Sequence, residues 1–275
     1  MNKKQPSNRI FAYLLLVIAV LTVICILASV VLLIVTVSKR NQGDTGEQAA
    51  PDSHTAAPLY EAPLPESADA GMEYIDKMIF FGESTTTHLR ARGVLSGGKE
   101  THQVWADSSG TKTLSSKMLS EKITYPPTDE DLTIAQAVAK EKPAYIVLSF
   151  GLNGIMGFVN NKDSYLNNYN KLINLITDAS PSTRIILQSV YPVSAECDDF
   201  SSDGKTVCGY TEILNGYLRE IAAAHENVRY ADTASVLKNA DGTLNSTYDE
   251  GDGVHLNTAA YEQILHYLRT HAWQD

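Results

Sequence analysis

The sequence predicts an α/β domain with a mainly parallel β-sheet, placed behind a membrane-spanning helix. Short apolar runs alternate with stretches of helical periodicity after residue 70, and a run of 27 residues without a charged side chain lies near the amino terminus. Strict alternation of strand and helix is typical of a parallel sheet with helices on both faces. The whole chain has 275 residues, which is enough for one domain with a sizeable core.

The amino-terminal apolar run, residues 11–37, predicts a transmembrane signal anchor. As a helix it would extend about 40 Å, whereas the hydrocarbon core of a membrane is about 30 Å thick. A cleavable signal peptide has a shorter apolar region that ends at small residues, and here the candidate pair Ala28-Ser29 lies in the middle of the run. Cys25 follows Ile24 rather than a small residue, so we interpret it as a buried apolar side chain and not as a lipid attachment site.

Charge suggests which side of the membrane the domain occupies. Three basic residues precede the apolar run and two follow it, which slightly favours a cytoplasmic tail at residues 1–10. All 32 acidic residues of the chain lie after the run, where they outnumber the remaining basic ones. Such a domain would repel nucleic acid, and the acidity also suits a soluble exported domain. We therefore expect a single-pass protein of the cell membrane with an extracytoplasmic domain and no nucleic-acid partner.

Residues 38–70 predict a flexible linker. They are rich in Ala, Pro, Glu and Asp and contain few large apolar residues, so they cannot bury enough surface to fold alone. We expect this tether to hold a domain at residues 71–275 away from the membrane.

The predicted strands are short apolar runs, at residues 77–81, 145–150, 184–191 and 227–231. The predicted helices have apolar residues at helical spacing, at residues 129–141, 163–178, 211–225 and 257–271. In the helix at 163–178 the apolar residues share one face: Tyr165, Tyr169, Leu172, Ile173 and Ile176. Asp163 is placed to cap the start of that helix.

The first predicted strand leads directly into the polar segment Gly82-Glu83-Ser84, which is followed by a stretch that can start a helix. In parallel sheets the reactive groups collect where the carboxyl ends of strands meet the amino ends of helices. Ser84 lies at such a junction, where the helix dipole favours a developing oxyanion. By position alone, Ser84 is equally well explained as a helix cap.

A second polar segment, "EGDGVHLNTAAYEQI" at residues 250–264, decides between these interpretations. Asp252 and His255 are three residues apart in a glycine-containing loop before a helix, so the carboxylate can turn back onto an imidazole nitrogen. A base and the group that orients it are thus supplied together. Asn257 is placed to cap the closing helix.

Three blocks in this order resemble the SGNH/GDSL hydrolase family over residues 77–271: Gly82-Glu83-Ser84, Gly151-Leu152-Asn153 and Asp252-x-x-His255. The resemblance implies a three-layer α/β/α, flavodoxin-like fold and no metal or organic cofactor. It also implies that Ser84 is the nucleophile, His255 the general base and Asp252 the group that orients His255.

The same resemblance implies that an oxyanion is bound by the backbone N–H of Ser84, the side-chain amide of Asn153 and a glycine, for which Gly110 is the candidate. The chain departs from the family pattern at three points. Gly110 lacks the usual flanking residues, Glu83 stands where the family usually has Asp, and Gly154 stands where an Asp commonly follows the Asn. We expect Glu83 to bind local backbone groups rather than to act in the chemistry.

These residues predict a serine esterase that works through an acyl-enzyme, with an ester-bearing small molecule or a glycan as substrate. The loops after the strands are mostly small and polar, which favours a short acyl group, acetyl in particular, over a long chain. An O-acyltransferase, a lysophospholipase or thioesterase, and a catalytically silent glycan-binding module are the alternatives.

Other side chains have plainer interpretations. His88, one turn after Ser84, could line the pocket, but we expect it to be an exposed helical residue. Met156 and Phe158 could shape the acyl site, but we expect them to serve in core or loop packing. The remaining histidines have no metal-ligand spacing, so no metal site is predicted. Outside the apolar run the only cysteines are Cys197 and Cys208, and an even number in an exported domain predicts a disulfide between them.

Overall fold

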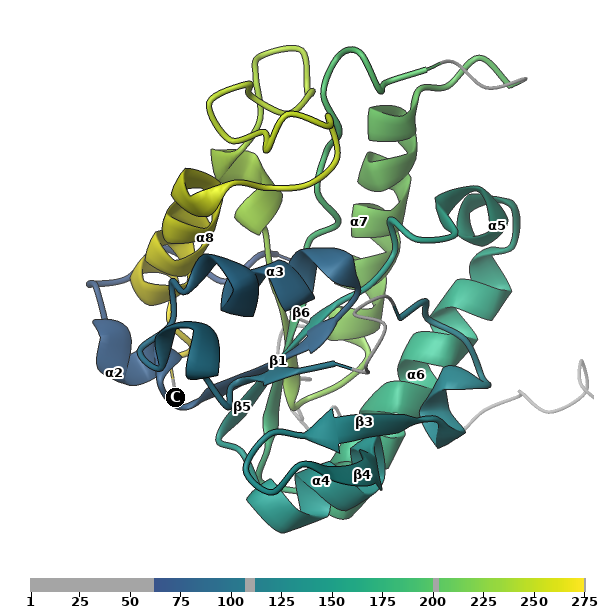
Figure 1. Ribbon diagram of the computed structural model, residues 1–275. Helices are drawn as coiled ribbons and strands as arrows, with labels where there is room; N and C mark the ends of the chain where they lie inside the picture. The colour runs from purple at the N-terminus through teal and green to yellow at the C-terminus, as the bar shows by residue number, and fades with distance from the viewer. Residues whose placement is uncertain (1–61, 107–111, 200–202, 275) are drawn as a thin grey trace, which may run out of the picture. The chain divides into compact units, whose positions relative to one another are not determined.

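The computed structural model describes residues 62–106, 112–199 and 203–274 (Figure 1). The predicted cytoplasmic tail, the predicted membrane span and most of the predicted linker lie outside the described residues, as does Gly110. Within the described ranges, no helix is both long enough and apolar enough to cross a membrane.

Among the described residues, five parallel strands form the central sheet in the order β2-β1-β5-β6-β7. The strands are β1 (Met78–Gly82), β2 (Val104–Trp105), β5 (Tyr145–Ser149), β6 (Arg184–Gln188) and β7 (Val228–Ala231). The register pairs Phe80 with Val147 and Gly82 with Ser149, so the ends of β1 and β5 lie side by side. The predicted parallel sheet is therefore confirmed.

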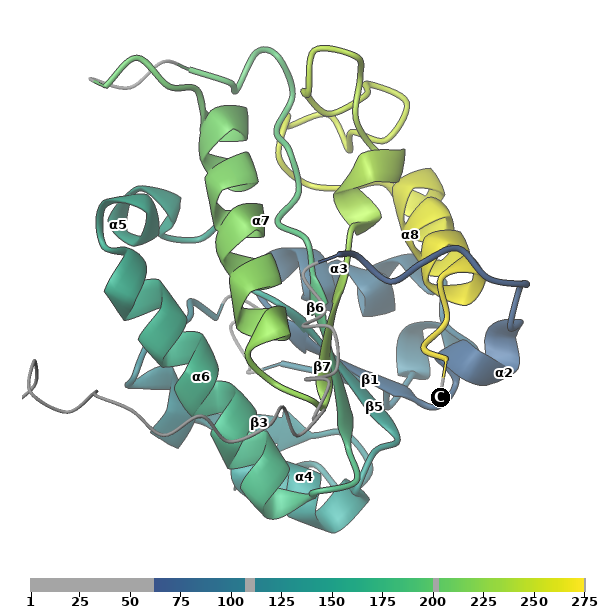
Figure 2. The ribbon, with the colours of Figure 1, turned by 180° about the vertical axis from the view of Figure 1, so that it is seen from behind.

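Helices cover both faces of this sheet (Figures 1 and 2). Along β1 the side chains alternate, with Ile79 and Phe81 in one apolar cluster and Met78 and Phe80 in the other. The first cluster is completed by α4, α6 and α7, and the second by α2, α3 and α8. Because both faces are covered, β1 and β5 are buried along their whole length, and β6 is buried after its first residue. Their continuous apolar runs predict this burial.

The helices of the described chain are α2 (Met72–Ile75), α3 (Ser84–Arg92), α4 (Ile134–Glu141), α5 (Ile155–Asn160), α6 (Lys162–Ala179), α7 (Val207–Ala223) and α8 (Thr258–Thr270). Short 3-10 turns lie at η1 (Gly98–Glu100), η2 (Met118–Ser120) and η3 (Thr233–Val236). The apolar face predicted for α6 is fully buried. Its cap is not Asp163, however, but Asn161, whose side chain accepts the N–H of Ser164 at 3.0 Å.

The predicted helix at 129–141 is shorter than expected because its first residues form a hairpin. Strands β3 (Lys122–Tyr125) and β4 (Glu130–Thr133) pair antiparallel in a small second sheet. Helix α4 begins only after Thr133, which forms a reciprocal capping box with Gln136. The Thr-x-x-Gln spacing was a signal for this boundary.

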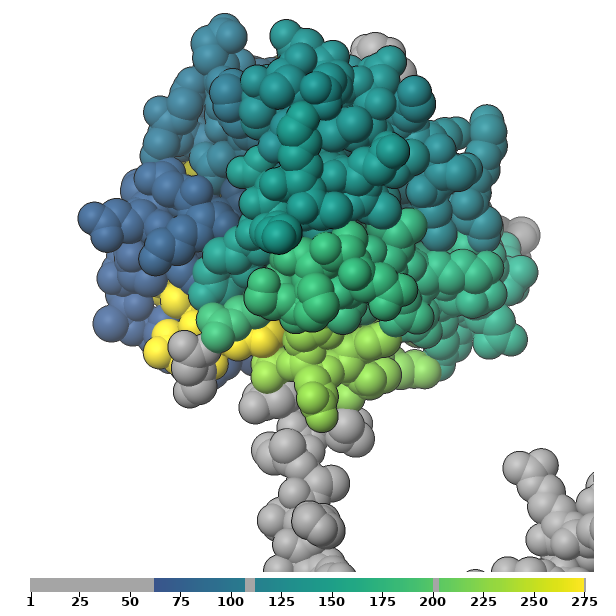
Figure 3. Space-filling view, turned by 90° about the horizontal axis from the view of Figure 1, so that it is seen from below, coloured from purple at the N-terminus to yellow at the C-terminus, as the bar shows by residue number. Residues whose placement is uncertain are grey.

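The end of the predicted linker packs on the domain, which corrects the boundary at residue 70. Leu64 is buried, and its N–H donates to the carbonyl of Tyr230 at 2.8 Å. The N–H of Ser67 donates to the carbonyl of Thr270, so the blue and yellow segments lie next to each other on the surface (Figure 3). One apolar side chain and a few backbone bonds are enough to add residues 62–70 to the domain.

The order of the strands determines where a site can form. The chain passes from β1 to β2 on one side and then returns to place β5 on the other side of β1. Such a reversal leaves a crevice outside the carboxyl ends of the two strands. The segments after β1 and β5, which contain Ser84 and Asn153, both begin at this crevice.

Candidate active site

Ser84 is the first residue of α3, directly beyond β1. The cap residue of this helix is Glu83, so the interpretation of Ser84 as a cap is wrong. The Oγ of Ser84 lies 3.2 Å from Nε2 of His255, within hydrogen-bond distance. The structure thus brings together two side chains that are 171 residues apart in the sequence.

Asp252 and His255 lie in the segment before α8, residues 249–257, which we call the acid–base loop. Nδ1 of His255 is 2.6 Å from Oδ2 of Asp252. The other carboxylate oxygen, Oδ1, accepts the backbone N–H groups of His255 at 2.7 Å and Val254 at 2.9 Å. These bonds, led by the backbone N–H of His255, hold the pKa of Asp252 well below its ordinary value. Asp252 is therefore an anion across the neutral pH range, although its side chain is half exposed.

The acid–base loop is kept in shape by its own polar groups. Asn257 accepts the N–H of Ala260 at 3.1 Å and so caps α8 as predicted. Its side-chain amide donates to the carbonyls of Thr247 and Asp249. The loop conformation that brings Asp252 under His255 is consequently fixed at both ends.

Gly82 allows α3 to start close to the sheet. A methyl group at this position would lie 2.1 Å from Oγ1 of Thr86 and 2.4 Å from the carbonyl oxygen of Ser149. Real side chains do not tolerate such contacts, and one of the two atoms belongs to the backbone of β5. The glycine before the serine is thus required by packing between β1, β5 and α3.

Glu83 ties the end of β1 to the segment after β5. It is 3% exposed, and its carboxylate accepts the N–H groups of Leu152 and Asn153, each at 3.0 Å. Burial raises the pKa of Glu83 to about 7, although these backbone bonds favour the charged form. Glu83 thus binds backbone groups as expected, but the expectation that they are local was wrong, because they lie 69 and 70 residues away in the sequence.

Asn153 is half-buried in the segment after β5. Its side-chain amide donates to the carbonyl of Lys112 at 3.4 Å, and the described chain resumes at Lys112 after a gap that includes Gly110. A role of Asn153 and Gly110 in binding an oxyanion stays a prediction.

His88 belongs to the site, and the expectation of an exposed side chain was wrong. Its half-buried ring lies against the ring of His255, with centroids 4.7 Å apart and planes inclined by 31°. Glu250, in the acid–base loop, forms an ion pair with Arg92 and lies 3.6 Å from Nδ1 of His88. The sequence carried a signal for these contacts, because His88 and Arg92 follow Ser84 at spacings of four and eight residues.

The remaining predicted residues lie around the site or apart from it. Phe158 is buried in the core as expected, whereas Met156 is 43% exposed. The predicted disulfide is not formed, because Cys197 and Cys208 are both free. Their sulfur atoms instead lie near different backbone carbonyls, those of Asp252 and Val193. Within the described ranges, no three His, Cys, Asp or Glu residues are grouped in a way that could hold a metal ion.

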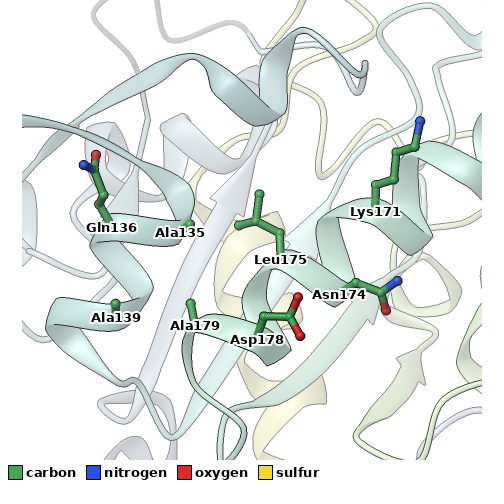
Figure 4. Close-up of a pocket in the computed structure, with 8 residues that line it drawn as sticks. All are labelled: Ala135, Gln136, Ala139, Lys171, Asn174, Leu175, Asp178 and Ala179. Atoms are coloured by element: carbon green, nitrogen blue, oxygen red, sulfur yellow. The ribbon is translucent and has the colours of Figure 1, made fainter.

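A hollow of about 660 Å³ lies away from these residues, between α4 and α6 (Figure 4). It is lined by Ala135, Gln136, Ala139, Lys171, Asn174, Leu175, Asp178 and Ala179. None of these carries a nucleophile or a base paired with one. The chemistry is thus concentrated at the carboxyl ends of β1 and β5.

The arrangement at this crevice is suited to acyl transfer. A serine hydroxyl can pass its proton to the imidazole, whose other nitrogen is held by an ionised carboxylate. The first N–H groups of a helix lack partners within that helix, so the start of α3 also offers donors for a developing negative charge.

Comparisons with known proteins agree with this chemistry. The sequence matches the GDSL-like lipase/acylhydrolase family over residues 80–263, and no curated protein matches it.

Among solved structures, the chain is similar to an acetyl esterase variant with an acetate ion, at 16% identity over 70% of this chain and 93% of that one, with a TM-score of 0.43. It is similar to a family 3 carbohydrate esterase from Talaromyces cellulolyticus, at 15% identity over 70% and 93% of the two chains (TM-score 0.42). It is also similar to a family 2 carbohydrate esterase from Clostridium thermocellum in complex with cellohexaose, at 12% identity over 81% and 65% (TM-score 0.45). At this level of similarity a substrate does not transfer from one protein to another.

Proposed function

The chain belongs to the GDSL-like lipase/acylhydrolase family and is a carboxylic ester hydrolase, and from this premise we propose that it is a membrane-tethered extracytoplasmic serine esterase. Its substrates in this proposal are short-chain esters, acetyl esters in particular, on carbohydrate of the cell envelope. The observation that carries the proposal is the continuous hydrogen-bonded row from Ser84 through His255 to Asp252.

In the proposed reaction His255 removes the proton of Ser84 as the Oγ attacks the ester carbonyl. The imidazolium that forms is stabilised by Asp252, which is 2.6 Å away and ionised. His255 then gives the proton to the departing alcohol, and an acyl-enzyme remains on Ser84. Water, activated by the same imidazole, releases the acid and restores the serine.

The negative charge of the tetrahedral intermediate requires donors placed in advance. The backbone N–H of Ser84 at the start of α3 and the side-chain amide of Asn153 are the proposed donors, and Gly110 is the proposed third. Glu83 supports this arrangement because it holds the backbone of Asn153 next to the end of β1. Loss of one donor of this kind typically reduces the rate by about 10²–10³.

The preference for a short acyl group rests on where the apolar side chains of the segment after β5 lie. Ile155 and Phe158 point into the core cluster and are 8% exposed. Of the residues that the structure describes, Met156 is the one large apolar side chain that is exposed. A long acyl chain gains about 0.8 kcal/mol for each buried methylene only where an apolar groove receives it. A lipase that meets a lipid surface would also need a broad apolar patch.

The cellular location in this proposal follows from the sequence before residue 62. Residues 11–37 are the proposed anchor, and residues 38–61 have the composition of a coil with a reach of roughly 25 Å. That reach would place the crevice among glycans of the envelope rather than at the lipid surface.

The proposal is tested with the purified full chain and 4-nitrophenyl esters of increasing acyl length, followed by acetylated and de-acetylated envelope glycan. We expect acetyl hydrolysis to exceed octanoyl hydrolysis and acetate to be released from the acetylated glycan alone. Octanoyl hydrolysis about tenfold faster than acetyl hydrolysis, with no acetate from any glycan, would reject the substrate class. An added glycan acceptor that captures the acyl group in place of water would identify a transferase instead.

A further inference from the structure

Helix α3 carries three functional side chains toward the acid–base loop. Ser84, His88 and Arg92 recur every four residues and therefore share one side of the helix. Together they face two residues of the loop. Ser84 and the ring of His88 contact His255, and Arg92 forms an ion pair with Glu250, whose carboxylate lies 3.6 Å from Nδ1 of His88. The residues beyond Ser84 thus form a second line of contact between helix and loop.

We propose that Glu250 is a positioning residue, held by its ion pair with Arg92, and that His88 packs beside this pair against the ring of His255. Through this contact, which we call the α3 clamp (His88, Arg92 and Glu250), the acid–base loop is fixed against α3 at the distance from Ser84 that proton transfer requires. The inference rests on the proposed function and adds to it the residues that set the geometry of the general base.

The acid–base loop has other contacts besides the α3 clamp. The hydrogen bonds of Asn257 run to Thr247 and Asp249, and the N–H of Glu250 donates to the carbonyl of His255. These bonds maintain the shape of the loop but do not join it to α3. The N–H of Ser194 also donates to the carbonyl of Gly253 at 2.8 Å, which joins the loop to the segment after β6 and again not to α3. On the α3 side, the approach of His255 to Ser84 is therefore supported by the side chains of the α3 clamp.

The ion pair of the α3 clamp is more buried than the carboxylate of Asp252. The side chains of Arg92 and Glu250 are 26% and 37% exposed, so their ion pair is partly shielded from water and is less screened than a fully exposed one. His255 itself is 29% exposed, and Asp252 is 53% exposed. Asp252 thus has little packing of its own, and an error of about 1 Å in the placement of a catalytic group can cost about 10²-fold in rate.

The ring of His88 lies against His255 and close to Glu250. Five titratable groups lie near this ring or near the ion pair of Arg92 with Glu250. They are Glu250, Asp252 and His255 on the loop, Arg92 on α3, and Tyr261 on α8. Burial and the neighbouring His255 lower the pKa of His88, which favours its neutral form. A neutral ring at 4.7 Å avoids the repulsion that a charged one would exert on an imidazolium at His255.

The α3 clamp can be removed without loss of the fold. Leu89 is buried in the core, and the hydroxyl of Tyr261 donates to the carbonyl of Thr85 at 2.6 Å, so α3 and α8 stay joined. The variants Glu250→Gln and Arg92→Ala should accordingly unfold at nearly the same temperature as the wild type. Asp69→Asn is a matched control, because it breaks an ion pair with Arg269 of similar exposure, 44% and 25%, on another part of the domain.

The test measures kcat and KM for 4-nitrophenyl acetate and the rate at which a fluorophosphonate labels Ser84, in the purified full chain. For Glu250→Gln and for Arg92→Ala we expect kcat and labelling to fall about tenfold, with KM changed less than about twofold. The double variant should be no slower than the worse single one, since both remove the same contact. Arg92→Lys should restore part of the rate, and Asp69→Asn should stay within about twofold of the wild type.

His88 is tested by two replacements. His88→Ala should lower kcat about fivefold, and His88→Phe, which keeps a ring but cannot be charged, should recover most of that loss. Equal rates in His88→Ala and the wild type would remove His88 from the α3 clamp.

Failure of this inference differs from failure of the proposed function. A wild-type chain that neither hydrolyses the ester nor reacts with the probe contradicts the esterase. An active wild type with folded Glu250→Gln and Arg92→Ala variants of unchanged kcat overturns the positioning role. The NMR signal of the Nδ1 proton of His255 tests the positioning role without an activity measurement. We expect this signal to shift or broaden in Glu250→Gln. An unchanged signal rejects the α3 clamp.

Discussion

Oε2 of Glu83 accepts the backbone N–H of Asn153 at 3.0 Å, so the residue before the candidate nucleophile holds the residue expected to bind the oxyanion. The two lie 70 positions apart in the sequence and at the ends of neighbouring strands. The carboxylate of Glu83 is nearly fully buried, and keeping it charged there costs free energy. We therefore expect the stability of the domain to depend on pH through this group.

Glu83 should make the domain less stable as the pH rises from about 4.5 to about 7. Burial raises its pKa from 4.5 to about 7, so in this range the folded chain keeps a proton that the unfolded chain releases. The free energy of unfolding then falls by about 3 kcal/mol through this group. Glu83→Gln should lack this decrease, which urea unfolding at pH 5 and pH 7.5 measures.

A control for this experiment is Glu220→Gln, on the exposed ion pair with Lys162. It should retain the pH dependence of the wild type. The same pH dependence in Glu83→Gln as in the wild type would show that Glu83 does not carry a raised pKa.

Gly82→Ala should destabilise the domain by about 3 kcal/mol or more. The added methyl group would lie 2.4 Å from the carbonyl oxygen of Ser149 and closer still to Thr86. Gly157→Ala, in α5, meets no atom within 4 Å and should leave stability unchanged or slightly raised. Urea unfolding of both variants compares them, and equal stability would mean that β1 and β5 have more room than the structure shows.

His255→Ala should lower kcat by roughly 10⁴–10⁶, and Asp252→Asn should cost less, roughly 10²–10⁴. An asparagine can still accept the backbone N–H groups of Val254 and His255, so the loop keeps its shape. It cannot stabilise the imidazolium with a negative charge. Initial ester hydrolysis rates measure both losses, and full activity in Asp252→Asn would remove Asp252 from the mechanism.

The two described cysteines should differ in reactivity. Burial raises the pKa of the Cys208 thiol to about 12, and the thiolate is the reactive form. Iodoacetamide at pH 8 should therefore modify Cys197 first in the native protein, as read by peptide mass spectrometry. Faster modification of Cys208, or a peptide in which the two cysteines are linked, would contradict the structure.

Local sequence rules were sufficient for the parts of the site that lie close together in the chain. Asp252 and His255 share one short loop, and Ser84 follows a strand directly, so spacing and strand position predicted all three. The hydrogen bond between Ser84 and His255 could only be inferred from the resemblance, because it spans 171 residues. The fold class was predictable for the same reason, since alternating runs and periodic stretches are local signals.

The missed features depend on how distant segments meet. The contact of His88 with His255 exists only after the acid–base loop has docked on α3. The hairpin of β3 and β4 has strands of four residues each, too short to show a period. The packing of residues 62–70 rests on one buried leucine in a segment whose composition otherwise predicts a coil.

Covalent labelling tests the central claim, that Ser84 is the nucleophile, most directly. The purified full chain is treated with a fluorophosphonate at neutral pH, digested, and analysed by mass spectrometry, with Ser84→Ala as the matched variant. The account predicts one modified residue, Ser84, with loss of ester hydrolysis in proportion to labelling, and no labelling in Ser84→Ala. Labelling of another residue, together with retained hydrolysis in Ser84→Ala, would contradict it.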